Sequence, residues 1–251
     1  MPCPEGRLII AVVCEGPSDL PVACDLTDRV VLTHSELTLD LLPARRDYRG
    51  ANVGSPFLAW RDVKSIAKEM GIRRHGRFTG AGVESQALED AQTARKALTI
   101  LDRAKPRPDA VILLRDSDGR PERQRGLDQA RGEPGYQFSV AIGVANTKRE
   151  CWVLSGFVPT SHEERERHKL TRQELGFDPC ISAHELTAKH DEDKRSAKRV
   201  LRFLTGGDWE RERVCWAETD LGILRSRGKT NGIDSFIDEL SRFIVPLFAR
   251  K

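Results

Sequence analysis

The chain has 251 residues, of which 39% are hydrophobic and 31% are charged, and its formal net charge is +3. This composition is typical of a globular protein with one large domain, or with one domain and an elaboration. The isoelectric point of about 8.6 permits a nucleic-acid partner without requiring one. No uncharged apolar run approaches the ~20 residues of a membrane helix, and the N-terminus lacks the basic segment of a signal peptide.

The cysteines and histidines do not follow the spacing of common zinc sites. The six cysteines include no CxxC pair, and no HExxH pattern occurs. Cys14 and Cys151 lie in apolar segments, which predicts small buried side chains. We therefore expect a reduced, cytoplasmic setting and no structural zinc.

Three apolar runs rich in Val, Ile and Leu are typical of strands that helices cover on both faces. They span 8–13, 110–114 and 138–144, the last of them broken by Gly143. Helices are predicted between these runs, at the ranges that begin near Asp19 and that span 62–70, 84–104 and part of 120–135. In the irregular region 34–58 we predict one short strand, at 37–42. Alternating strands and helices predict an α/β fold with a mostly parallel sheet.

The chain becomes more charged and helical from Arg149 onward. Helical periodicity marks the ranges 161–174, 194–204 and 233–249. We predict two parts: residues 1–158 form the α/β core, and residues 159–251 form a helical C-terminal elaboration packed on it.

Acidic motifs follow two of the predicted strands. Glu15-Gly16 comes directly after the first, and Asp116-Ser117-Asp118-Gly119 comes after strand 110–114. Ligands of parallel sheets bind at the carboxyl ends of the strands, so we expect these carboxylates to converge. Asp116 and Asp118 would face the same side of an extended segment. Carboxylate oxygens without His or Cys favour Mg²⁺ or Mn²⁺.

Two further acidic residues extend the candidate metal site. If Glu15, Asp19 and Glu150 form a second cluster, two metals ~4 Å apart could clamp a phosphodiester. Each motif also has a structural interpretation that the sequence leaves open. Asp116 to Gly119 is a typical turn, Ser18 or Asp19 can cap a helix, and an acidic residue such as Glu150 is favoured in a first helical turn.

The order of these motifs resembles the Toprim domain, the metal-dependent fold of topoisomerases, primases and OLD-type nucleases. The match rests on Glu15-Gly16 in CEGPSD and on Asp116-x-Asp118-Gly119 in LLRDSDG. Their separation of about a hundred residues is more similar to the elaborated Toprim-like proteins related to OLD nucleases, many of which resemble bacterial anti-phage components. Glu150, just before Trp152-Val153-Leu154, matches an acidic residue of those relatives. The resemblance spans residues 8–156 and implies a Rossmann-like core with a long insertion.

OLD-like nucleases also place a basic residue near the scissile phosphate. Lys194 or Lys198 could stabilise charge on the phosphoryl oxygens, and Lys148 and Arg149 are comparable candidates. The spacing does not choose between them, and a run of mixed charge is most often a solvated face.

The resemblance implies a Mg²⁺- or Mn²⁺-dependent nuclease that acts on DNA in preference to RNA, in which Glu15, Asp116, Asp118 and Lys194 are catalytic. Two alternatives stay open: a non-catalytic partner or sensor subunit, and a phosphoryl-transfer enzyme acting on small nucleotides. Gly228-Lys229-Thr230 lacks the glycine of a P-loop, because Ile223 occupies that position. Any ATPase motor is therefore expected to be a separate protein of a larger defence assembly.

Overall fold

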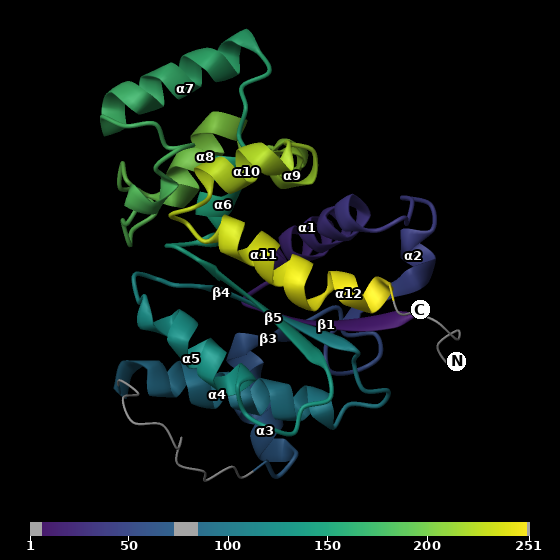
Figure 1. Cartoon of the computed structure of the whole chain (residues 1–251). Coiled ribbons are helices and arrows are strands. Elements are labelled where there is room, and N and C mark those ends of the chain that lie inside the picture. Colours follow the sequence, from purple (N-terminus) through teal and green to yellow (C-terminus); the bar gives the residue numbers. More distant parts are fainter. Residues whose placement is uncertain (1–6, 73–84, 250–251) are drawn as a thin grey trace. The chain divides into compact units, whose positions relative to one another are not determined.

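The computed structural model describes residues 7–72 and 85–249 (Figure 1). The chain divides into two compact units. Unit 1 comprises Met1–Leu114, Arg120–Gly143 and Asp238–Lys251, and unit 2 comprises Arg115–Gly119 and Val144–Ile237. The boundary expected between residues 158 and 159 thus lies inside unit 2.

A five-stranded sheet with the order β2-β1-β4-β5 organises the core, and β3 pairs with β1 beyond the end of β2. The strands are β1 (Leu8–Cys14), β2 (Arg46–Arg49), β3 (Leu58–Ala59), β4 (Ala110–Asp116) and β5 (Ser139–Ala145). β1 is parallel to β2, β3 and β4, and every residue of β1 is buried. The predicted α/β fold with a mostly parallel sheet is confirmed.

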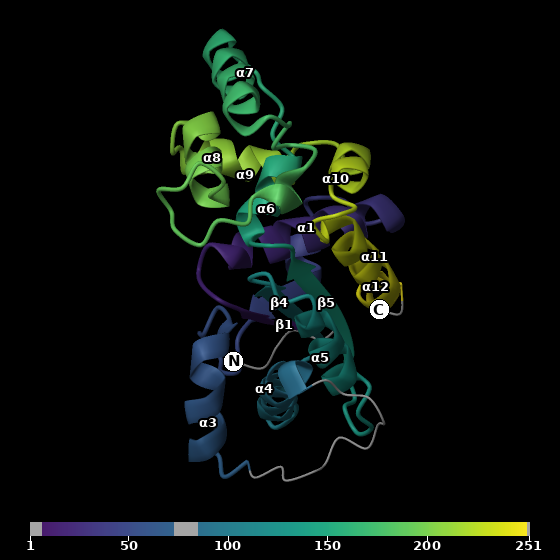
Figure 2. The same ribbon diagram turned by 90° about the vertical axis from the view of Figure 1, so that its left-hand side faces the viewer.

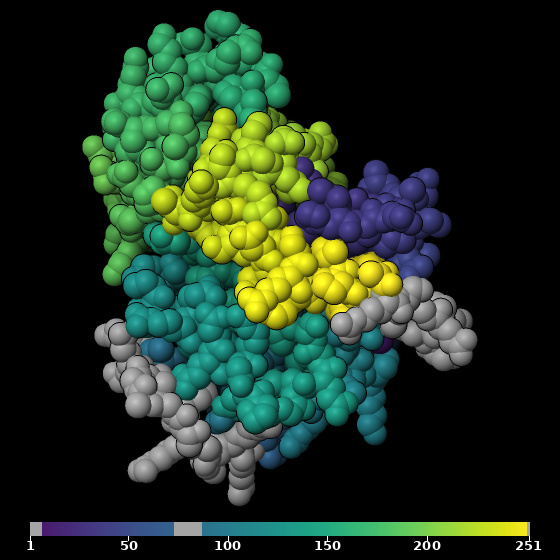
Figure 3. Space-filling view, viewed as in Figure 1, coloured from purple at the N-terminus to yellow at the C-terminus, as the bar shows by residue number. Residues whose placement is uncertain are grey.

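Helices cover both faces of this sheet in unit 1 (Figures 1 and 2). α3 (Val63–Glu69), α4 (Ser85–Asp102) and α5 (Glu122–Arg131) lie on one face, and α1 (Asp19–His34) and α12 (Val245–Phe248) on the other. α12, coloured yellow, lies at the surface in the view of Figure 3.

The predicted periodicity of α4 is confirmed, because Ala91, Ala94, Leu98 and Leu101 are fully buried. The predicted first residue of this helix, Glu84, lies outside the described residues. α5 packs closely on α4 at Gly126, where a Cβ atom would lie 2.6 Å from the carbonyl oxygen of Ala87. Alanine at that position would therefore push the two helices apart.

Two predictions about strands are wrong. No strand spans 37–42, where Leu39 and Leu41 are 74% and 55% exposed; α2 (Leu42–Arg45) and the edge strand β2 follow instead. β2 is polar because its side chains bind at the edge of the sheet rather than fill the core: Arg46 and Tyr48 both bind the carboxylate of Asp28. Gly143 does not break the third predicted strand, since β5 runs through it to Ala145.

Unit 2 is built around α6 (Arg149–Ser155), in which every residue is buried. The other helices within unit 2 are α7 (His162–Leu175), α8 (Ala197–Thr205), α9 (Trp209–Ala217) and α10 (Leu221–Arg227). Trp152 stacks on Phe236 with ring centroids 5.1 Å apart, and both side chains are fully buried. Unit 2 ends within α11 (Ile233–Phe243), and Pro246 occupies the first turn of α12, so the predicted helix 233–249 is two helices. Across the described ranges, no helix combines the length and the apolar content needed to cross a membrane.

Candidate functional site

The carboxylate of Asp19 closes the loop that follows β1. Its Oδ2 atom accepts a 2.8 Å hydrogen bond from the Gly16 N–H, and the Asp19 N–H donates to the Gly16 carbonyl at 3.2 Å. Ser18 occupies the N-cap position of α1 but makes no side-chain capping bond. Asp19 therefore fixes the conformation of the Glu15-Gly16 motif.

Glu15 lies beside a buried arginine that the sequence did not single out. The Arg123 side chain is only 2% exposed; its Nε atom lies 3.4 Å from Oδ1 of Asp90, and its Nη1 atom lies 4.0 Å from Oε1 of Glu15. Asp90 is also buried, whereas the Glu15 side chain is 41% exposed. Unit 1 thus places a fixed positive charge behind a solvent-facing carboxylate. An arginine in a charged helix carries no sequence signal for such a role.

The Asp116 motif is tied to the segment that follows β5. Oδ1 of Asp116 accepts a 2.8 Å hydrogen bond from the N–H of Arg149, the first residue of α6. The N–H groups of Ser117 and Asp118 donate to the carbonyls of Ala145 and Thr147, at 2.8 and 3.0 Å. Unit 2 therefore brings the predicted Asp116 motif next to the predicted Arg149-Glu150 segment.

The backbone at Asp118 is a turn rather than an extended segment. β4 ends at Asp116, and Asp118 and Gly119 have φ angles of 48° and 73°, in the left-handed region. Asp is one of the few residues that adopt this conformation readily. The expectation that Asp116 and Asp118 face the same side of an extended segment is therefore wrong, while the turn interpretation describes the backbone correctly.

Glu150 and Lys194 line one cavity of about 770 Å³ within unit 2. Glu150 is 8% exposed, and its Oε1 atom lies 3.3 Å from Nη2 of Arg149. Other charged side chains that line the cavity are Arg149, Arg167, Glu174, Asp191, Glu192, Lys198, Arg199, Arg202 and Glu212. Three of the four basic candidates named from the sequence therefore lie at this cavity, together with the predicted acidic residue.

Burial and nearby charge both affect the pKa of Glu212, a carboxyl group that lines this cavity. Burial raises the pKa of Glu212, the guanidinium of Arg149 opposes that effect, and the charge of Glu150 adds to it. The side chains of Lys194 and Lys198 are both exposed, and Nζ of Lys198 lies 3.7 Å from Oδ2 of Asp191. Lys194 is thus the better placed of the two lysines to meet an anionic ligand.

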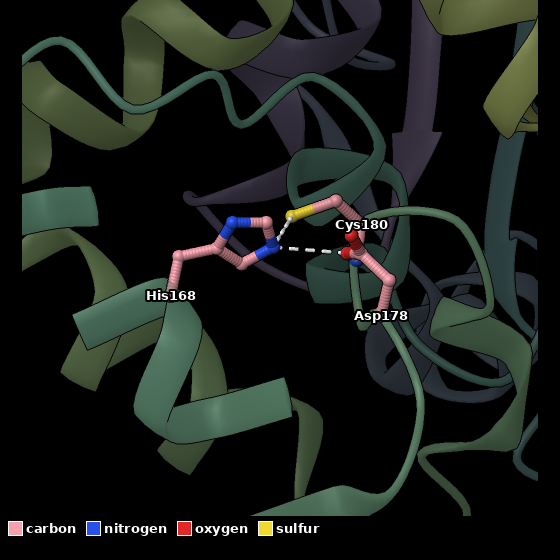
Figure 4. A group of neighbouring side chains, drawn as sticks. All are labelled: His168, Asp178 and Cys180. Atoms are coloured by element: carbon pink, nitrogen blue, oxygen red, sulfur yellow. Dashed lines mark hydrogen bonds and ion pairs between the residues drawn. The ribbon is translucent and has the colours of Figure 1, made fainter. Parts of the chain in front are cut away.

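A different group of side chains meets at the end of α7. His168, Asp178 and Cys180 each offer one ligand atom, and these three atoms lie within 4.8 Å of one another (Figure 4). Asp116, Asp118 and Glu150 form no such group in the described part of unit 2. The sequence search missed the His-Asp-Cys group because Asp-x-Cys, with a histidine ten residues before the Asp, is not a recognised metal-binding spacing.

Comparison of the chain with protein-family models, with curated protein sequences and with solved structures finds no match. The assignment of the fold therefore rests on the order and register of the strands.

Proposed function

We propose that this chain is a Toprim-like, Mg²⁺- or Mn²⁺-dependent nuclease that hydrolyses phosphodiester bonds of DNA in preference to RNA. One observation carries the proposal. The strands that lead into the two acidic motifs, β1 and β4, are parallel neighbours, with Val13 opposite Leu113. Ligand sites of parallel sheets form where adjacent strands end, and here both chain segments leave the sheet with carboxylates.

The donor set suits a hard cation. Asp116, Asp118 and Glu15 would provide carboxylate oxygens, with Asp19 and Glu150 as further ligands, and Mg²⁺ characteristically binds few carboxylates plus substrate phosphate. A metal bound there would supply Lewis-acid stabilisation of the phosphoryl oxygens and a more acidic bound water.

The residues around these carboxylates have supporting roles. The Arg149 N–H orients Asp116, and the buried Arg123 orients Glu15. Lys194 would stabilise negative charge as the phosphodiester is attacked. Lys194 and Lys198 both line the same cavity as Glu150, and the carboxylate of Asp191 beside Lys198 favours Lys194 for this role.

The cavity itself favours a second candidate, phosphoryl transfer on a small nucleotide. Its volume of about 770 Å³ is in the range of small-molecule sites, and both signs of charge line it. In this alternative the same carboxylates act on a mononucleotide rather than on a polymer. A separate ATPase or another subunit of a defence assembly remains an expected partner in either case.

Cleavage and metal binding should be measured on the same samples. Calorimetry with Mn²⁺ and nicking of supercoiled plasmid are compared for wild type and for Asp116→Asn, which keeps an acceptor for the Arg149 N–H while losing the charge. Glu166→Gln, on the exposed face of α7, is the matched control. We expect Asp116→Asn to lose both binding and nicking, and the control to keep both.

Other outcomes separate the candidates. Hydrolysis of nucleoside triphosphates without nicking of plasmid or cleavage of RNA would favour the small-nucleotide enzyme. Metal binding without any hydrolysis would favour a non-catalytic subunit. Equal nicking by wild type and Asp116→Asn would contradict the carboxylate site.

A further inference from the structure

The His168-Asp178-Cys180 group is assembled by the way α7 ends. The helix stops at Leu175, and Gly176 adopts a left-handed conformation with φ of 79° while its N–H donates to the Arg172 carbonyl. The chain then turns back, so that Asp178 and Cys180 reach His168 two helical turns before the end (Figure 4). Local backbone geometry thus holds the three side chains together within unit 2.

Two of the three ligand atoms, Oδ1 of Asp178 and Sγ of Cys180, lie close to the third, Nε2 of His168. Nε2 of His168 lies 2.9 Å from Oδ1 of Asp178 and 3.6 Å from Sγ of Cys180. One ring nitrogen carries at most one hydrogen, so it cannot form a full hydrogen bond with both partners. A thiol nucleophile activated through histidine would instead use the two ring nitrogens for its two partners. The 2.9 Å contact with Asp178 is an ordinary hydrogen bond, the same hydrogen does not also serve Sγ of Cys180 at 3.6 Å, and two partners on one nitrogen do not form a catalytic triad.

The distance between the histidine nitrogen and the cysteine sulfur fits a tetrahedral metal centre. Zn–N and Zn–S bonds of about 2.05 and 2.3 Å at a tetrahedral angle separate nitrogen and sulfur by about 3.6 Å. The observed separation of Nε2 and Sγ is 3.6 Å. The corresponding nitrogen–oxygen separation is about 3.4 Å, so Asp178 would move outward by about half an ångström from its present contact with the histidine.

The donor set and exposure identify the class of cation. Nitrogen, sulfur and carboxylate oxygen together suit Zn²⁺, whereas Mg²⁺ takes oxygen ligands. The His168 and Asp178 side chains are each 18% exposed, so water can reach the group, while Cys180 is 2% exposed. Burial and the nearby charge of Asp178 raise the pKa of the Cys180 thiol. The positive charge of a bound cation would offset burial and the charge of Asp178, and would favour the deprotonated thiolate of Cys180.

We propose that His168, Asp178 and Cys180 bind one zinc ion, with water as the fourth ligand, at a site separate from the carboxylates of the proposed nuclease. The ion links α7 to the loop after it. Zinc binding at these three residues does not depend on the proposed nuclease chemistry, so failure of one proposal leaves the other unaffected.

Cobalt provides the direct test, because a cobalt–thiolate bond adds a near-ultraviolet charge-transfer absorption. The full chain is stripped with chelator and titrated with Co²⁺ in excess Mg²⁺, and Zn²⁺ is then added as competitor. We expect one equivalent of Co²⁺ to produce the band and one of Zn²⁺ to abolish it. The band should be lost in Cys180→Ser and persist in Cys24→Ser, a partly exposed thiol of unit 1.

His168→Gln and Asp178→Asn keep the proposal testable if Cys180→Ser does not fold. In both we expect Zn²⁺ to lose its effect on the melting temperature, whereas it raises that of wild type. Absence of the band in wild type would overturn the site. So would a band that persists in Cys180→Ser, or an equal thermal shift in wild type and His168→Gln.

Discussion

Arg123 reaches to within 4.0 Å of the Glu15 carboxylate while its own side chain is almost fully buried. The same guanidinium lies 3.4 Å from Asp90, so α4 and α5 together fix a cation behind the loop that follows β1. Such a cation has little freedom to move, and its attraction orients Glu15 toward one arrangement. Arg123 is thus a positioning residue for the proposed site rather than a ligand.

Variants that remove the Arg123 guanidinium should show its effect on the free energy of unfolding separately from its effect on nicking. Arg123→Met leaves the buried Asp90 carboxylate without its arginine, and we expect the free energy of unfolding to fall by about 3 kcal/mol. The double variant Arg123→Met/Asp90→Leu replaces the pair with apolar side chains and should recover most of that loss. Urea denaturation measures both effects.

We expect Arg123→Met to nick plasmid with Mn²⁺ more slowly than wild type. The double variant should nick as slowly as Arg123→Met, because Glu15 still lacks its arginine. If the stabilised double variant nicks as well as wild type, Arg123 has only a structural role. Glu69→Gln, which removes one exposed charge at the end of α3, is the control and should nick plasmid as wild type does.

The left-handed backbone at Asp118 allows its turn and ligand roles to be tested separately. Asn tolerates this conformation as Asp does, while Ala does not. We expect Asp118→Asn to lose Mn²⁺-dependent nicking with almost no change in stability without metal. Asp118→Ala should lose nicking and also about 1 kcal/mol of stability.

Thermal and urea unfolding of the metal-free proteins, run beside the nicking assay, measure the two quantities. Full activity in Asp118→Asn would show that the residue serves only the turn. Asp118→Gly relieves the backbone cost, so it should match Asp118→Asn in both measurements.

The buried ion pair between Glu164 and Arg211 predicts a dependence of stability on pH. Arg211 donates to both carboxylate oxygens, at 2.6 and 3.1 Å, and the Thr160 N–H donates at 2.7 Å. Burial raises the pKa of Glu164, but these hydrogen bonds outweigh it and lower the pKa from 4.5 to about 2. The pair therefore stabilises the fold above pH 4.5 and loses that contribution as the pH falls toward 2.

Glu164→Gln should remove this contribution. We expect it to lower the free energy of unfolding by about 3 kcal/mol at neutral pH, with the difference from wild type vanishing near pH 2. Urea midpoints at a series of pH values give the measurement. Glu163→Gln, whose side chain is 86% exposed on the same helix, is the matched control and should follow wild type throughout. A difference that does not change with pH would contradict this role.

Asn231 joins several backbone segments inside unit 2. Its amide nitrogen donates to the Cys151 carbonyl at 2.9 Å and to Oγ of Ser155 at 2.6 Å. The main-chain carbonyl oxygen of Asn231 accepts from Nε1 of Trp152 at 2.7 Å and from the Asn146 N–H at 2.9 Å. Asn231→Leu keeps the main-chain bonds but removes both side-chain hydrogen bonds, to the Cys151 carbonyl and to Oγ of Ser155, and we expect a loss of about 2 kcal/mol.

Chemical denaturation compares this variant with Asn231→Asp, which replaces the donating nitrogen with an oxygen. Both variants should be destabilised, and Asn231→Asp by more, since a buried charge would face the Cys151 carbonyl. Stability equal to that of wild type in either variant would rule out the proposed role of the amide.

Much of the architecture was predictable because its signals are local. The runs that became β1 and β4 are apolar at every position that a doubly covered strand requires, and α4 shows its buried face in the spacing of Ala91, Ala94 and Leu98. The edge strand β2 was not predicted because its residues are polar and most are only partly buried, so its sequence shows no apolar pattern. Asp28, which binds its Arg46 and Tyr48, lies on α1 and is distant in sequence.

The sequence by itself determined the α/β class, the burial of Cys14 and Cys151, and which carboxylates follow the strands, since each depends on neighbouring residues in the chain. The tertiary structure decided which distant side chains meet: Arg123 with Asp90 and Glu15, Glu150 with Lys194 at one cavity, and His168 with Cys180. Such pairings carry no periodic signal. They arise because packing of the core fixes where each polar side chain emerges, and a buried or crowded charge then needs whichever partner lies there.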